Sequence, residues 1–134
     1  MIKPTAVNKG FIGPVLAMIN RAGFRIVAVK YLKLSESDAQ SFYEVHKEKH
    51  FYNDLIKFMS SGPIIAAILE KENAVEAYRE LIGATDPAKA ADGTVRKYYG
   101  TSIEANAVHG SDSDENAKVE ADFFFAKSDR LDYM

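Results

Sequence analysis

The chain has 134 residues, of which 47% are hydrophobic and 27% charged, with a formal net charge of −2 at pH 7. These proportions are typical of a single globular domain over residues 1–134, and they exclude a globally basic surface for specific nucleic-acid binding. The chain has no cysteine and no apolar run near the ~20 residues that span a bilayer, so we expect no disulfide, no membrane partner and a cytoplasmic location.

The first half of the chain alternates between helical and strand patterns. Apolar residues recur at helical spacing over 12–19, and Gly23 is a suitable stop. Residues 24–34 are rich in Val, Ile and Tyr, which predicts a strand. Ser35, followed three residues later by an acid, predicts a helix over 35–47, and a second short helix is expected over 51–59.

The second half continues the alternation. The run PIIAAIL over 63–69 predicts a strand buried on both faces. Asn73 is expected to cap a helix over 73–82, and a long loop is expected over 83–104. A short strand over 105–109 then precedes a helix over 112–125, opened by a capping-box pattern. Strands separated by helices predict an α/β or α+β sandwich with one sheet.

The segment NAVHGSDS, residues 106–113, places His109 at a strand-to-helix junction. Histidine serves as a nucleophile or proton carrier near neutral pH, and the start of a helix favours an anion such as phosphate. Glu120 lies about two helical turns after Asp112, close enough to reach back and orient the imidazole. The alternatives are a structural histidine and a solvated glutamate.

Three cations are candidates for binding phosphate oxygens, although each is by default a surface residue. They are Lys3, Arg79 and Arg96. Arginine offers a planar fork of donors and lysine a point charge, so three converging cations would suit a di- or triphosphate.

Aromatic and histidine residues in the first half are more simply explained by structure. Core packing is the default for Tyr43 and Phe51. His46 and His50 have a spacing that suits a metal ion, but no third ligand is evident, so we expect both to face solvent.

The segment NAVHGSDSDENA resembles the active-site signature of nucleoside diphosphate kinases. Further family motifs occur in the same order along almost the whole chain. They are IKP at 2–4, the GFR turn at 23–25, SGP at 61–63 and IGATDPAKAADGTVR at 82–96.

The resemblance implies an α+β fold of the ferredoxin-like βαββαβ type, with one antiparallel sheet covered by helices. Family members usually carry several residues before the IKP motif, and these form most of the first strand. With only a stub over 1–3, we expect a shortened first strand, unpaired backbone groups on its neighbours and an open apolar groove.

The resemblance also implies transfer of the γ-phosphate of a nucleoside triphosphate, typically ATP, to a nucleoside diphosphate. His109 matches the histidine that becomes phosphorylated in this ping-pong reaction, and Glu120 and Ser111 match the residues that hold it. Lys3 and Tyr43 match further catalytic positions. The nucleotide site is implied at Lys3, Phe51, Leu55, Arg79, Thr85, Arg96, Ile103, Asn106 and Gly110.

Within this set, Phe51 matches the aromatic residue on which the base stacks, with Leu55 and Ile103 lining the same cleft. Stacking reads little of a base's edge, so broad nucleotide specificity is implied. Mg²⁺ is the implied cofactor, held through nucleotide phosphates and without direct protein ligands.

The family forms hexamers or tetramers built from a common dimer, so a homo-oligomer is implied here. The alternative function is a nucleotide-binding or interaction scaffold of the same fold, with activity lost through the shortened N-terminus. The intact set of candidate site residues argues against that alternative.

Overall fold

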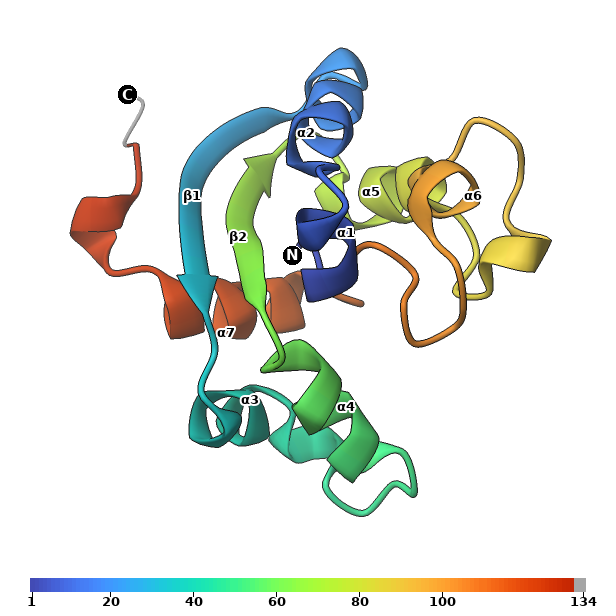
Figure 1. Ribbon diagram of the computed structural model, residues 1–134. Coiled ribbons are helices and arrows are strands. Elements are labelled where there is room, and N and C mark those ends of the chain that lie inside the picture. The colour runs from blue at the N-terminus through green and yellow to red at the C-terminus, as the bar shows by residue number, and fades with distance from the viewer. Residues whose placement is uncertain (132–134) are drawn as a thin grey trace.

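The computed structural model describes residues 1–131, in which short helices surround two long strands (Figure 1). The strands are β1 (Arg25–Lys33) and β2 (Pro63–Glu70). The α-helices are α1 (Pro4–Asn8), α2 (Ile12–Arg21), α3 (Glu36–Phe42), α4 (Tyr52–Met59), α5 (Ala74–Ile82), α6 (Val95–Tyr99) and α7 (Asp114–Phe124), and the 3₁₀ turns are η1 (Glu44–His46), η2 (Pro87–Lys89) and η3 (Lys127–Asp129).

The sheet is antiparallel, and the IKP segment extends it by one residue. β1 pairs with β2, with Val29 opposite Ala67 and an irregularity between Ile26 and Ala28. On the other edge of β2, Ile2 donates its N–H to the Ile65 carbonyl at 2.7 Å and accepts from the Ile65 N–H at 3.2 Å. Ile2 also bridges to Val108, so the N-terminal stub lies between β2 and the His109 segment.

An apolar cavity of about 150 Å³ lies beside this single bridge. Its lining includes Ala67 and Leu69 of β2, Ile19 of α2 and Phe124 of α7. Alternation along a strand turns the backbone groups of Ala67 and Leu69 toward the edge on which Ile65 meets Ile2. The apolar groove expected beside a shortened first strand is therefore present.

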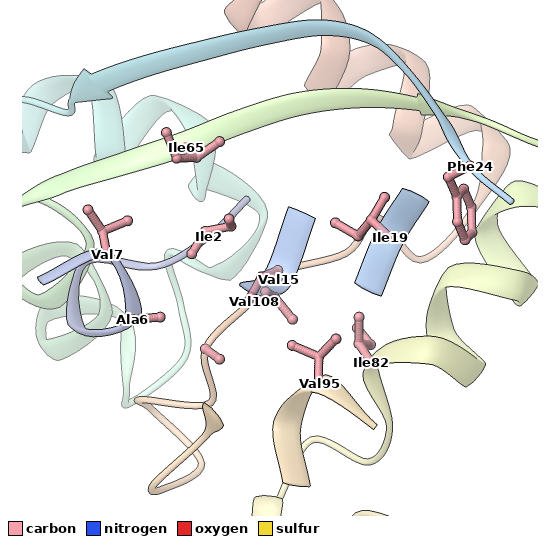
Figure 2. Packing of buried hydrophobic residues seen from close by; sticks show 11 residues of the cluster. Ile2, Ala6, Val7, Val15, Ile19, Phe24, Ile65, Ile82, Val95 and Val108 are labelled. Carbon is pink, nitrogen blue, oxygen red and sulfur yellow. The ribbon is translucent and has the colours of Figure 1, made fainter. Parts of the chain in front are cut away.

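Both faces of β2 are buried, as the sequence PIIAAIL predicts. Ile65 packs against one cluster with Val15 and Ile19 of α2 (Figure 2). Ala66 faces the opposite side, where it packs against Phe125 at the end of α7. Helices α1 and α2 thus cover one face of the sheet and α7 covers the other (Figure 1), which is an α+β arrangement.

The predicted strand over 105–109 is wrong: it is reduced to one bridge at Val108. Ala107 has φ 76°, in the left-handed region, and the Val108 N–H donates to the Asn106 carbonyl at 3.0 Å. This tight turn interrupts any ladder, because a strand requires extended backbone at every residue.

Several helix boundaries also differ from the sequence prediction. The helix expected to reach Lys47 ends at Phe42 and continues only as the turn η1. The loop over 83–104 contains η2 and α6, and α1 was not expected. Asn73 precedes α5 with φ 52° but makes no side-chain cap. The cap of α7 is Ser113, whose Oγ accepts from the Asn116 N–H, instead of Asp112.

None of the helices over residues 1–131 combines the length and apolar character that crossing a membrane requires.

Candidate active site

His109 stands directly after the Val108 bridge, where the backbone is tied to the N-terminal stub. Its N–H donates to the Met1 carbonyl at 2.9 Å. Its side chain remains 23% exposed, and Nε2 lies 2.6 Å from Glu120 Oε1. The backbone is thus held by sheet-like bonds while the imidazole reaches the surface.

Glu120 reaches His109 because α7 starts at Asp114 and runs back across the sheet. Ser111 Oγ donates to the same Glu120 oxygen at 3.0 Å, so three predicted residues form one hydrogen-bonded chain. A neutral imidazole that donates from Nε2 to the carboxylate keeps Nδ1 as its lone-pair nitrogen. Within residues 1–131, no hydrogen bond joins Nδ1 to another group.

Burial and hydrogen bonding act in opposite directions on this pair. Burial lowers the pKa of His109, and the hydrogen bond from its ring to Glu120 only partly opposes this. For Glu120, burial acts to raise the pKa, but hydrogen bonds from His109 and Ser111 outweigh it and lower the pKa. The pair is therefore a neutral imidazole beside a carboxylate at neutral pH.

Two aromatic rings contact the imidazole edge-to-face. The Phe42 centroid lies 5.7 Å from that of His109 with an interplanar angle of 73°, and Tyr43 lies at 6.2 Å and 89°. Tyr43 is only 5% exposed, and within the described chain its buried hydroxyl has no hydrogen-bond partner. Burial raises the pKa of Tyr43, so its hydroxyl stays protonated and can donate to an incoming oxygen.

Two of the three predicted cations lie beside the His109 segment. Arg96 donates from Nη2 to the Val108 carbonyl at 2.9 Å and from Nη1 to Gly83 at 3.1 Å, which leaves its buried Nε unpartnered among residues 1–131. Lys3 is 8% exposed, and its Nζ lies 3.4 Å from the Glu104 carbonyl. Burial and the charge of Arg96 lower the pKa of Lys3 to about 8.

Asn106 and Thr85 are joined across the long loop. Asn106 Nδ2 donates to the Thr85 carbonyl at 3.0 Å. Its Oδ1 is buried and has no partner in the described chain, although the residue is only 2% exposed. The left-handed Ala107 lies next to it, and backbone strain of this kind is often found at functional sites.

Arg79 and Gly110 are the remaining residues predicted to contact phosphate. The pKa of Arg96 is lowered mainly by burial and that of Asp112 mainly by a hydrogen bond from Asn116, and the charge of Arg79 lowers both only slightly, so the place of Arg79 in the site stays a prediction. A Cβ on Gly110 would come within 2.8 Å of the Tyr78 ring. Glycine is therefore needed where this backbone passes α5.

The residues predicted to hold a base are less tightly connected. Phe51 is 39% exposed, and Ile103 is 62% exposed on the long loop. Leu55 packs against the cluster that contains Tyr43. Phe51 is joined to the His109 surroundings by ring contacts through His46, while the place of Ile103 in the same cleft stays a prediction.

His46 was predicted to face solvent, and this is wrong. It is half-buried, with ring centroids 6.3 Å from Tyr43 and 5.8 Å from Phe51, and its buried Nδ1 has no partner among the described residues. Its helical spacing of three residues from Tyr43 was a usable signal. His50 is exposed, as expected.

The site offers more polar groups than the described chain satisfies. Unpaired buried polar atoms are costly and rare unless they serve a ligand. Here they are Tyr43 Oη, His46 Nδ1, Arg96 Nε and Asn106 Oδ1. Over residues 1–131, no three histidine or carboxylate side chains group as metal ligands. The arrangement suits a bound polar ligand beside the His109 imidazole.

Comparisons with known proteins agree with this geometry. The family model "Nucleoside diphosphate kinase" matches residues 1–130. A nucleoside diphosphate kinase of Flavobacterium psychrophilum is 62% identical over 126 residues, which cover 94% of this chain and 91% of that protein. The one from Campylobacter hominis is 58% identical over 94% of this chain and 92% of its own length.

Solved structures show the same fold. The nucleoside diphosphate kinase of Aquifex aeolicus superposes with a TM-score of 0.95 at 41% identity, covering 97% of this chain and 94% of that one. That of Halobacterium salinarum, in complex with CDP, gives 0.94 at 33% identity over 99% and 89%. The α+β fold is thus the ferredoxin-like one expected, and the chain belongs to the nucleoside diphosphate kinase family of enzymes.

Proposed function

We propose that this enzyme moves the γ-phosphate of a nucleoside triphosphate, typically ATP, to a nucleoside diphosphate through a phosphohistidine on His109. The observation that carries the proposal is the chain from Ser111 and Glu120 to His109 Nε2, which leaves Nδ1 as the free nitrogen. Unpartnered buried polar atoms also belong to Tyr43, whose ring contacts that of His109, and to Arg96, which donates to the neighbouring Val108 carbonyl.

In the first step, the Nδ1 lone pair attacks the γ-phosphorus and the bond to the oxygen that bridges to the β-phosphorus breaks. The nucleoside diphosphate leaves with that electron pair. In the second step, a terminal β-phosphate oxygen of another diphosphate attacks the phosphorus, and the N–P bond electrons return to Nδ1. Glu120 stabilises the positive charge that builds on the ring while Nε2 keeps its proton.

The cations supply the charge that phosphoryl transfer requires. Lys3, Arg79 and Arg96 neutralise the phosphate oxygens. The Tyr43 hydroxyl donates to a phosphate oxygen, and Asn106 Oδ1 accepts from a ribose hydroxyl. Thr85 and Gly110 complete the phosphate side. A bound phosphate also gives the Lys3 ammonium group an anionic partner, which offsets the effect of burial on its charge.

A stacked base explains broad specificity. Phe51 presents a partly exposed ring, and Leu55 and the exposed Ile103 are the residues proposed to line the same cleft. Stacking accepts every base because each has a π-face. The Halobacterium relative was solved in complex with CDP, which supports nucleotide binding by this chain.

Mg²⁺ is the cofactor we propose. The donor set of the site consists of cations and hydrogen-bonding groups, which fits an ion that arrives on the nucleotide without needing a protein cage. When bound there, Mg²⁺ neutralises phosphate charge. A homo-oligomer built from dimers and a cytoplasmic location are likewise proposed, from the family resemblance and the cysteine-free composition.

The decisive experiment compares wild type with His109→Ala. Wild type incubated with Mg-ATP should carry acid-labile phosphate, and a coupled assay with ATP and a different diphosphate should show turnover. His109→Ala should lose both while still binding ADP. Turnover by folded His109→Ala would refute the mechanism. Nucleotide binding by wild type without turnover would support the scaffold alternative, which the close kinase relatives do not favour.

A further inference from the structure

Phe42, the last residue of α3, joins the imidazole of His109 to the end of α7. Its ring lies 5.7 Å from that of His109 in an edge-to-face arrangement. The same ring lies 5.2 Å from Phe123 and 5.3 Å from Phe124. Phe42 is therefore part of a continuous aromatic cluster between α3, His109 and α7.

The α7 end of this cluster is connected to Glu120. Phe123 and Phe124 follow Glu120 by three and four residues, so all three lie on neighbouring positions of one helix face. Glu120 is the residue whose carboxylate binds His109 Nε2. Phe42 thus contacts both the nucleophile and the helix turn next to its hydrogen-bond partner.

A single hydrogen bond does not fix an aromatic ring. The bond from Nε2 to Glu120 holds one ring atom, but the imidazole can still tilt about the line from Cβ to Nε2. Rings packed against it from the side restrict that tilt. Phe42 and Tyr43, at interplanar angles of 73° and 89°, provide this contact. Attack on phosphorus requires an aligned lone pair, so the tilt decides whether Nδ1 is productive.

We propose that Phe42 is a positioning residue that holds the His109 imidazole in line for phosphoryl transfer. The inference rests on the proposed function, because it assumes that Nδ1 is the atom that attacks. Tyr43 has a free hydroxyl and belongs to the binding site, whereas Phe42 offers only its ring. Its contribution is therefore confined to geometry.

The competing explanation is ordinary core packing, because Phe42 also packs against the cluster of Leu34, Ile56 and Ile64. Phe58 provides a matched control. It is a half-buried phenylalanine on α4 that packs against the same cluster, and none of the ring contacts in the described chain joins it to His109.

The test compares Phe42→Leu, Phe42→Tyr and Phe58→Leu with wild type. We would measure the single-turnover rate of His109 phosphorylation at saturating Mg-ATP, the affinity for ADP and the thermal unfolding midpoint. Phe42→Leu should slow phosphorylation by about 10- to 100-fold, because small misplacements of reacting atoms have effects of this size. Its ADP affinity should stay within about 2-fold of wild type, well below that rate effect.

The controls separate positioning from stability. Phe58→Leu should lower the unfolding midpoint as much as Phe42→Leu and keep the wild-type phosphorylation rate. Phe42→Tyr keeps the ring and should retain most of the rate. If His109 in Phe42→Leu is phosphorylated at the wild-type rate, or if both leucine variants are slowed equally, the positioning role of Phe42 is overturned and the proposed function is not. A wild-type protein without phosphohistidine would instead refute the proposed function, and the role of Phe42 with it.

Discussion

The charge of the His109 imidazole is set by its immediate surroundings. Burial lowers its pKa from the ordinary value of 6.5, and the hydrogen bond to Glu120 raises it by less. The ring is therefore neutral at pH 7 with a lone pair on Nδ1. A side chain in this state is a nucleophile without first losing a proton, which suits reaction at neutral pH.

The rate of His109 phosphorylation should therefore be constant above pH 7 and decrease as the pH falls below 6.5, through the lowered pKa. The protonated ring has no lone pair, so the acid side is the inactive one. Single-turnover phosphorylation by Mg-ATP across this range is the measurement. In Glu120→Gln the fall should move to still lower pH, because the raising influence of the carboxylate is gone. A rate that fell through a pKa above 7 would contradict this explanation.

Gly110 is required by a close approach between backbone and ring. A Cβ there would lie 2.8 Å from Cδ2 and Cε2 of Tyr78, which is overpacked. Gly110→Ala should lower the free energy of unfolding by about 1–3 kcal/mol in urea denaturation. Gly13→Ala is the control, because a Cβ there would meet nothing within 4 Å apart from its chain neighbours and the backbone of its own helix. The prediction fails if both variants unfold at the wild-type urea concentration.

At the scale of elements, α7 is the helix that completes the site. Its first turn carries Asp114 and Glu115, which favour the positive end of the helix dipole, and Ser113 satisfies the free Asn116 N–H. From this start the helix crosses the sheet and brings Glu120 to His109. The stability of this helix end therefore bears on the geometry of the contact between Glu120 and His109.

Ser113→Ala should cost about 1 kcal/mol of stability, because the Asn116 N–H loses its acceptor. Ser113→Asp restores an acceptor and should cost little. Chemical denaturation of the three proteins measures the difference. Equal loss in the alanine and aspartate variants would show that the serine hydroxyl is not the group that matters.

The elements that were predicted correctly carry strong local signals. β2 was recognised from an unbroken apolar run, and Ser35 caps α3 through the Asp38 N–H as its spacing suggested. The missed elements α1 and α6 have five residues each, too short to show a period. The prediction of a strand over 105–109 was wrong because the surroundings of Ala107 impose a left-handed backbone conformation on it. The identity of the residue, an alanine, gives no indication of that conformation in the sequence.

At the scale of the whole molecule, the site draws on segments far apart in the chain. Lys3 comes from the N-terminal stub, Tyr43 from the end of α3, Arg96 from α6 and Glu120 from α7. Burial lowers the pKa of Lys3 to about 8, so its charge is kept at neutral pH but at a cost in stability. The buried polar groups of the site therefore lower the stability of the free protein, and a bound nucleotide would satisfy them.

ADP and CDP should both stabilise the protein, by about 2.7 kcal/mol at a concentration 100-fold above Kd. Lys3→Met should raise the unfolding midpoint of the free protein, because it removes a buried charge, and should reduce the stabilisation by either nucleotide. Thermal melts with and without nucleotide measure both effects. A Lys3→Met protein that melts below wild type and binds ADP equally well would contradict this account.

The sequence by itself determined the family, the buried strand β2, the proposed site residue His109 and the helical spacing that lets Glu120 reach it. These follow from local signals: composition, period, capping residues and a motif contained in one segment. The tertiary structure alone decided the partnership of Asn106 with Thr85, the burial of Lys3 and the half-buried place of His46 beside Tyr43 and Phe51. These depend on how distant segments pack together, and long-range packing is not encoded in the spacing of any single segment.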